Sequence, residues 1–259
     1  MTREVFLTQP HKKLVAWVLI VLATAGAGAA CFLPPLTDSP AYFQFADRRT
    51  ILGVPRFMDV ASNASFAIVG VLGLMFLWRS RRRPSALSVC EPWEWLAFAT
   101  FFVGTVLIAA GSAYFHLEPS PATLFWDRLP MAIAFMSLFA LAAGDRLDAR
   151  AGRILFAPLL ACGIGSVLYW RHTGDLRFYL PVQFFPMLAL PLLALLPARY
   201  IRRSDLAALV GFYAVAKLLE FEDGQVLAVT GWIGGHSLKH IAAAMAAAML
   251  LRTVRPRDP

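Results

Sequence analysis

Eight long apolar runs constrain the fold of this sequence more than any other feature. Pro181, Pro186 and Pro191 fall in the sixth run and predict a kinked helix there, which a packed membrane helix tolerates. Most of the runs approach the roughly 20 residues that one helical crossing of a bilayer requires. We therefore expect an all-α fold, a polytopic membrane helical bundle. The runs cover roughly residues 14–33, 60–78, 95–115, 129–143, 154–170, 178–197, 206–221 and 236–251.

The composition excludes several other classes of protein. Hydrophobic residues make up 59% of the chain and charged residues 15%, against about 45–50% and about 25% in soluble domains. A water-soluble enzyme, a nucleic-acid-binding domain and a disordered chain are therefore excluded. The net charge of +8 comes from basic residues in short runs between the apolar stretches, so it reflects membrane topology and not a nucleic-acid partner.

Lys and Arg are distributed unevenly between the loops. With the N-terminus in the cytoplasm, sixteen fall in inside segments and six in outside segments, and the run Arg79–Arg83 is the densest. Because cytoplasmic loops are enriched in these residues, we expect an integral multi-pass protein with eight helices and both termini cytoplasmic. The first apolar run is also compatible with a signal sequence, since Lys12 and Lys13 precede it and small residues end it. Whether it is retained therefore stays open.

Polar residues gather at one predicted depth of the membrane. Residues four apart lie on one helical face, so Ser112 and His116 point the same way at the outer end of the third helix. His236 and His240 do the same at the outer start of the last helix, and Asp127 stands at the outer start of the fourth. Ionisable residues inside membrane segments are costly and usually functional. These five residues are therefore the candidate site.

Three imidazoles, a carboxylate and a hydroxyl suit a catalytic zinc ion, which keeps three protein ligands and leaves one position for water. Asp127 could orient or deprotonate that water, and Ser112 could hydrogen-bond the developing oxyanion. Taken singly, each residue has a simpler explanation. A histidine near a helix end can be interfacial, Asp127 can serve the helix dipole, and Ser112 can bond a backbone carbonyl. The convergence of all five favours a site.

The pattern Ser112-x3-His116, Asp127, His236-x3-His240 resembles the alkaline ceramidase family, seven-helix membrane hydrolases related to adiponectin-type receptors. The segment Asp59–Asn63 also resembles the start of that family's first helix. The likeness runs from about Phe45 to Leu251. We accordingly expect residues 1–41 to hold a cytoplasmic tail, an extra transmembrane helix and the start of an outer segment. Residues 42–259 would form the ceramidase-like seven-helix domain and a cytoplasmic C-terminal tail.

The resemblance implies zinc bound by His116, His236 and His240, with Asp127 and Ser112 in catalytic roles. The implied reaction is hydrolysis of a lipid amide within the bilayer, ceramide to a sphingoid base and a free fatty acid, at the outer (periplasmic or lumenal) face. No nucleic-acid partner is implied, and neither the oligomeric state nor the acyl chain is indicated.

Two departures from the family stand out. Eukaryotic members carry an acidic calcium-binding segment ahead of their first helix, whereas this chain has Asp47-Arg48-Arg49-Thr50, which is too basic to carry calcium over. Lys239 lies inside the histidine motif, where an aromatic residue is commoner. The alternatives are a lipid-binding receptor or sensor without turnover, a hydrolase of another lipid amide or ester, and a transporter that relays protons through histidines.

Overall fold

The computed structural model describes residues 3–81 and 90–255 and is helical almost throughout. An antiparallel hairpin of β1 (Thr50–Ile51) and β2 (Val54–Pro55) is its only sheet within those residues. The all-α membrane fold that the apolar runs predict is confirmed. The helices are α1 (Arg3–Phe32), the short 3₁₀ helix η1 (Pro40–Phe43), α2 (Phe57–Ser62), α3 (Ala64–Ser80), α4 (Pro92–Leu117), α5 (Pro121–Arg146), α6 (Ala149–Thr173), α7 (Tyr179–Ala194), α8 (Arg203–Phe221), α9 (Asp223–Thr230), α10 (Gly235–Ala248) and α11 (Leu251–Val254).

Six helical stretches of the described chain are long and apolar enough to cross a membrane. The stretch that begins at Phe57 joins α2 to α3, and the one that begins at Gly235 joins α10 to α11. This is therefore a multi-pass helical membrane protein. The six stretches are Pro10–Phe32, Phe57–Ser80, Pro92–Leu117, Pro121–Arg146, Ala149–Thr173 and Gly235–Val254.

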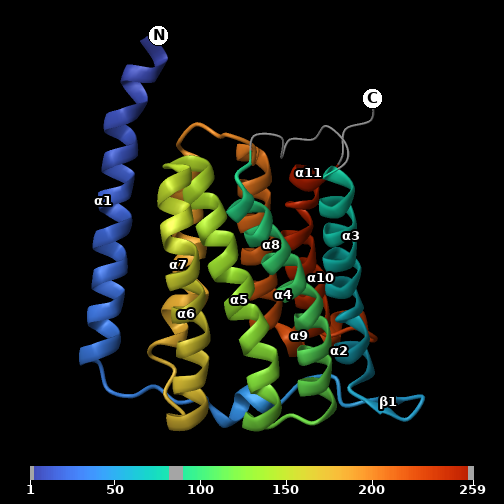
Figure 1. Ribbon diagram of the computed structural model, residues 1–259. Coiled ribbons are helices and arrows are strands. Elements are labelled where there is room, and N and C mark those ends of the chain that lie inside the picture. The colour runs from blue at the N-terminus through green and yellow to red at the C-terminus, as the bar shows by residue number, and fades with distance from the viewer. Residues whose placement is uncertain (1–2, 82–89, 256–259) are drawn as a thin grey trace.

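The other two predicted crossings are also helical but differ in length or charge. α7 has 16 residues, which gives a length of about 24 Å, short of the roughly 30 Å of a hydrocarbon core. Pro186 and Pro191 lie inside it, and Pro181 lies in its first turn. α8 carries Lys217 and Glu220 on its second half. Both helices stand within the bundle beside the six longer ones (Figure 1).

The helices run along a common direction, with both chain termini at one end of the bundle (Figure 1). The connections α5–α6 and α7–α8 lie at that same end, as the charge pattern predicts for the inside loops. The β1–β2 hairpin, η1 and α9 lie at the opposite end. Arg82, Arg83 and Arg257, which contribute to the charge asymmetry, lie outside the described residues.

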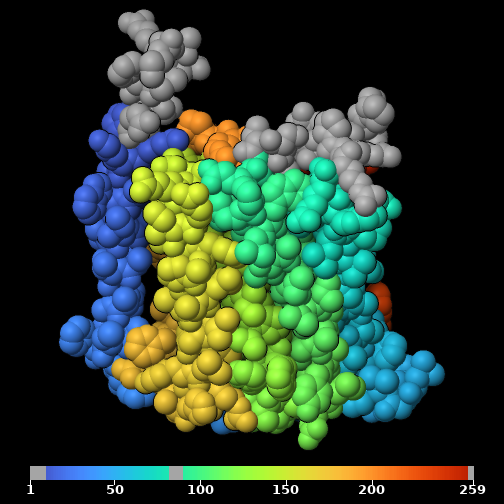
Figure 2. All heavy atoms as spheres, in the orientation of Figure 1, coloured from blue at the N-terminus to red at the C-terminus, as the bar shows by residue number. Residues whose placement is uncertain are grey.

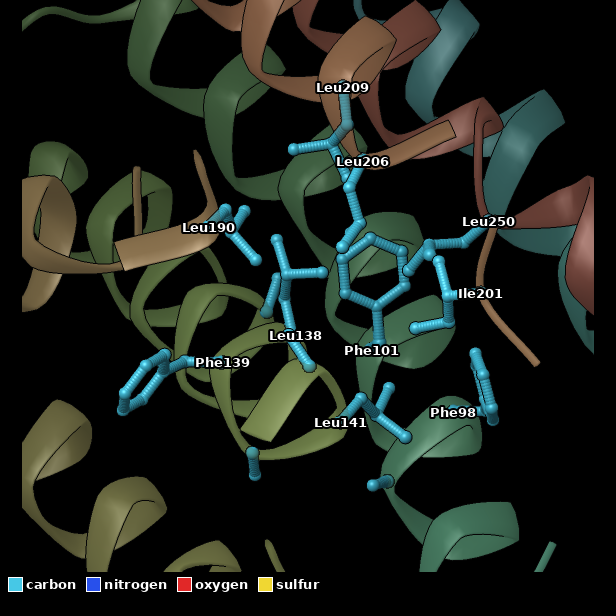
Figure 3. Packing of buried hydrophobic residues seen from close by; sticks show 14 of the residues in the cluster. Phe98, Phe101, Leu138, Phe139, Leu141, Leu190, Ile201, Leu206, Leu209 and Leu250 are labelled. Atoms are coloured by element: carbon cyan, nitrogen blue, oxygen red, sulfur yellow. The ribbon is translucent and has the colours of Figure 1, made fainter. Parts of the chain in front are cut away.

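The half of the bundle nearest the termini is filled by large apolar side chains. Figure 3 shows Phe98 and Phe101 from α4 against Leu138 and Leu141 from α5, with Leu206 of α8 above them. Phe98, Leu141 and Leu206 are completely shielded from solvent. Close packing leaves no room for a ligand around these last three side chains.

A polar network closes the same end of the bundle. Glu94 Oε1 accepts hydrogen bonds from Arg199 at 2.7 Å and from the Tyr200 hydroxyl at 2.9 Å. The fully buried Arg146 donates to the carbonyls of Leu196 and Ile201 at 2.8 and 2.6 Å. Because every buried polar group that lacks a partner costs stability, this network fixes the α7–α8 connection in place.

The first helix stands apart from the others. α1 contacts α7, and Leu19 is buried there. Most of its other side chains face outward, including Trp17, which is 66% exposed. Figure 2 shows a gap beside the middle of α1. The domain boundary at residues 41 and 42 stays a prediction.

Candidate metal centre

Three histidines that are far apart in the sequence meet at the end of the bundle opposite the termini. His116 comes from the last turn of α4, and His236 and His240 come from the first two turns of α10. Their side-chain nitrogens lie within 4.8 Å of one another, and all three residues are buried. The spacing therefore brings the predicted ligand residues together in space.

The ring nitrogens of this cluster have the properties expected of metal ligands. His116 Nδ1 and His236 Nε2 are buried, and neither has a hydrogen-bond partner among the described residues. His240 Nδ1 is 2.8 Å from the Ser62 hydroxyl, which leaves Nε2 of that ring for another partner. Buried polar atoms are normally satisfied, so unpaired imidazole nitrogens facing a common point indicate a missing ligand. The residues fit a metal ion, and three imidazoles suit the zinc of a catalytic site.

Aromatic packing holds the cluster in place. The Phe45 ring meets His116 and His236 edge to face, with centroid separations of 4.6 and 4.8 Å. Phe45 is itself buried and belongs to the segment that crosses the end of the bundle opposite the termini. It covers the histidines and shields them from that side.

Two polar residues of α2, Asp59 and Ser62, contact the start of α10 beside its histidines. The Ser237 hydroxyl donates to Asp59 Oδ1 at 2.6 Å, and Ser62 contacts His240 as described above. Partners of this kind fix the orientation and tautomer of a ligating imidazole. The sequence of Asp59–Asn63 does not indicate these contacts, because they join residues 178 positions apart.

Asp223 fixes the beginning of α10. Its Oδ1 accepts a hydrogen bond from the His236 backbone N–H at 2.9 Å, and its Oδ2 accepts one from Ala46 at the same distance. A side chain in place of Gly235 would come within 2.1 Å of the Leu219 carbonyl oxygen, so only glycine lets α10 begin this close to α8. Asp223 thus caps α10 and ties it to the backbone of Ala46.

Ser112 of α4 and Asp127 of α5 lie where these two helices pack together. Both side chains are buried, and both line the same cavity. α5 begins at Pro121, earlier than the predicted start near residue 129, because Ser120 caps it and proline occupies its first position. Asp127 therefore lies in the second turn, inside the helix, and is not a charge at the helix terminus.

The close approach of α4 and α5 beside these residues depends on a glycine and a proline. Pro130 has no N–H to donate to the Trp126 carbonyl four residues earlier. Gly111 packs against that carbonyl so tightly that an added Cβ would lie 1.9 Å from the oxygen. Ser112 directly follows Gly111 in the chain, and Asp127 directly follows Trp126.

A cavity of about 1000 Å³, counted with its mouth, runs inward from this level. Ser112, Asp127 and His240 line its polar end, and Tyr42 lies at the same end. Phe101, eleven residues before Ser112 on α4, lines it too, so the cavity is about 16 Å deep. That depth is about half of a hydrocarbon core of roughly 30 Å, the length of one lipid tail.

Lys217, Glu220 and Lys239 occupy the α8 and α10 side of the cavity. Lys217 pairs with Glu220 one turn later on the same helix. Lys239 binds the other oxygen of Glu220 at 2.7 Å, a contact between helices that the sequence did not indicate.

The strap, residues 34–47, crosses the end of the bundle that holds the histidines and is anchored by charged contacts. Both oxygens of Asp38 accept hydrogen bonds from Arg128, at 2.9 and 2.5 Å. Trp170 Nε1 donates to Asp38 as well, at 2.8 Å, and Arg128 lies 4.2 Å from the centroid of the Trp170 ring. A bidentate Arg–carboxylate pair stacked on an aromatic ring is a rigid anchor.

The segment that would correspond to a calcium site does not fit calcium. Arg49 donates to both oxygens of Asp47, at 2.7 and 2.8 Å, and holds the pKa of that carboxyl below its usual range. The Arg56 guanidinium bonds the carbonyls of His116 and Leu117. Calcium sites need several oxygen ligands around the ion, and here guanidinium groups occupy the oxygens.

In comparisons with known proteins, no family model, no curated protein and no solved structure matches this chain. The likeness to the alkaline ceramidases therefore rests on the site residues and their spacing.

Proposed function

We propose that this protein is a zinc-dependent intramembrane hydrolase that cleaves the amide bond of a lipid, with ceramide as the reference substrate. The observation that carries the proposal is the buried triad of His116, His236 and His240. His116 and His236 each have an unpaired ring nitrogen, and His240 lines the polar end of a cavity one lipid tail deep. A lipid tail in the cavity would bring a polar bond near the cavity mouth to the level of the histidines.

The chemistry of the residues supports hydrolysis. His116, His236 and His240 would hold the zinc ion, which would supply a water molecule with its pKa lowered toward about 7. Asp127 is a carboxylate that lines the cavity from α5, and it would take the proton of that water. Ser112 lines the same cavity from α4 and would donate a hydrogen bond to the oxyanion of the cleaved carbonyl. The cavity keeps bulk water away from all three groups, which strengthens these interactions.

The decisive experiment combines metal analysis with a lipid-amide assay on the purified protein. Wild-type protein should hold about one zinc, because three protein ligands define one site, and should release free fatty acid from ceramide. His240→Ala should lose the metal. Asp127→Asn and Ser112→Ala should keep it and lose turnover by about 100-fold or more, the scale of a lost acid/base group or oxyanion donor.

Matched controls lie at the closed end of the bundle. Ser137→Ala removes another buried helical serine, which bonds the Ile133 carbonyl, and Asp205→Asn removes a buried carboxylate that pairs with Arg252. Both should keep metal and activity. Wild-type protein without bound zinc, or full activity in Asp127→Asn, contradicts the proposal, and zinc-loaded protein that binds lipid amides without cleaving any supports a receptor.

A further inference from the structure

Two lysines share one carboxylate in the wall of the cavity, directly beside the histidines. Glu220 Oε1 lies 2.7 Å from Lys239 Nζ, and Oε2 pairs with Lys217. The side chains of Lys239 and Glu220 are 19% and 21% exposed, and both residues line the cavity. The remaining exposure is therefore toward the space that a ligand would fill.

The charges on this wall do not balance. Each ammonium has three N–H donors, and the two groups have a single carboxylate between them. Among the described residues lining the cavity, the other acidic side chain is Asp127, which lies on α5, whereas the two lysines and Glu220 lie on α8 and α10. Arg128 lines the cavity as well and is neutralised by Asp38 of the strap. A divalent metal ion at the histidines would add further positive charge.

Charged groups at this depth are costly and persist where they serve a function. Glu220 alone would be neutralised by Lys217 on its own helix. The addition of Lys239 from α10 is therefore not needed to satisfy the carboxylate, and it places a second cation in a largely apolar cavity. An excess buried cation is stabilised when an anion binds to it.

We propose that Lys239 and Lys217 bind the anionic headgroup of the substrate, a carboxylate or a phosphate attached to the lipid amide. The inference rests on the proposed function and narrows its substrate class. Lys239 directly precedes His240, so it lies within about 1.5 Å of that residue along the helix axis. The anionic group would therefore bind at the depth of the metal, while the tail extends toward Phe101.

The test measures binding separately from cleavage. Zinc-loaded Ser112→Ala protein serves as the background, because loss of the oxyanion donor slows turnover of the ligands by about 100-fold or more and leaves every charged side chain of the cavity in place. Two matched pairs with the same acyl chain are compared: ceramide 1-phosphate with ceramide, and N-acylglycine with its methyl ester. The anionic member of at least one pair should bind about tenfold more tightly than its neutral partner, since a buried charge pair at an interface contributes on this scale. The pair with the larger ratio distinguishes phosphate from carboxylate.

Lysine variants connect the preference to these residues. Lys239→Met and Lys217→Met, each on the same background, should reduce the tenfold ratio to about twofold or less. Each is tested because either one alone risks a folding defect. Glu220→Gln should keep or increase the ratio, which a merely structural salt bridge would not do. Lys12→Met is the matched control: Lys12 contacts the Leu147 carbonyl near the opposite end, and the ratio should not change.

Equal affinity within both pairs, or a preference for the anion that survives the loss of both lysines, overturns the inference. Such a result leaves the hydrolase proposal intact if wild-type protein cleaves ceramide. Conversely, a lysine-dependent preference in a protein that cleaves no lipid amide keeps the anion site and removes the hydrolase.

Discussion

Gly111→Ala is the sharpest structural test of the site, because the glycine contacts α5 one residue before Ser112. The new Cβ would lie 1.9 Å from the Trp126 carbonyl oxygen, whereas such contacts are essentially never shorter than 3.0 Å. α4 and α5 must therefore separate by about 1 Å at this level, a displacement that costs about 100-fold in rate when it falls on reacting groups. Overpacking of this kind also costs about 1–3 kcal/mol of stability.

Gly165→Ala is the matched control, since Gly165 also lies inside a helix, α6, but has no atom within 4 Å of an added Cβ. Alanine is the better helix former by about 0.8–1.0 kcal/mol, so this variant should be as stable as wild type or more so. Thermal unfolding in detergent and fatty-acid release from a lipid amide are measured for both variants. If Gly111→Ala matches Gly165→Ala in stability, the tight α4–α5 contact described here is wrong. If Gly111→Ala is destabilised yet fully active, the contact is right, but Ser112 and Asp127 do not need it.

Three further predictions follow from single contacts. Ser62→Ala removes the partner of His240 Nδ1 and should weaken zinc binding about 10- to 100-fold in chelator competition. The control Ser65→Ala loses only a bond to the Ser62 carbonyl and should not weaken it. Equal zinc affinities of the two variants would refute the supporting role of Ser62. Reporter fusions after Arg150 and Arg203 should read cytoplasmic and fusions near Asp47 and Asp223 external, because of the basic asymmetry, and a cytoplasmic signal at Asp223 would break that topology. Arg177 lowers the pKa of Asp175 to about 2 from an ordinary value of 3.8. Asp175→Asn should therefore lower the unfolding temperature at neutral pH, and its difference from wild type should shrink as the pH falls from about 4 to about 2. A difference in unfolding temperature that does not depend on pH would exclude the ion pair as its cause.

The sequence predicts the helices well because each membrane crossing is encoded locally by its own apolar run. It also predicts that the five candidate residues share one end of the bundle, since the alternation of inside and outside loops fixes the depth of every helix terminus. The meeting of His116 with His236 and His240 at one point required a further fact, namely that α4 and α10 are close in space. The common depth of the three histidines and the resemblance to a known family both favoured that expectation.

The parts that could not be predicted depend on contacts between distant segments. Asp59 and Ser62 look like ordinary polar residues at a helix start, and their contacts with Ser237 and His240 exist only because α2 packs on α10. The contact of Lys239 with Glu220 likewise exists only because α10 packs on α8. The available signal was the presence of polar residues inside apolar runs. That signal indicates which residues matter, but it does not indicate which residues they contact.

The separation of α1 from the bundle determines which of its residues matter. Lipid tails solvate leucine as well as protein does, so an apolar flank gains little by leaving lipid for protein. Polar hydrogen bonds instead hold the helix at its two ends. Lys12 bonds the Leu147 carbonyl at one end, and Arg177 and Asp175 hold Leu33 and Leu36 at the other. Its middle is therefore free to vary in sequence as long as it stays apolar, while the few polar bonds at its two ends set its position.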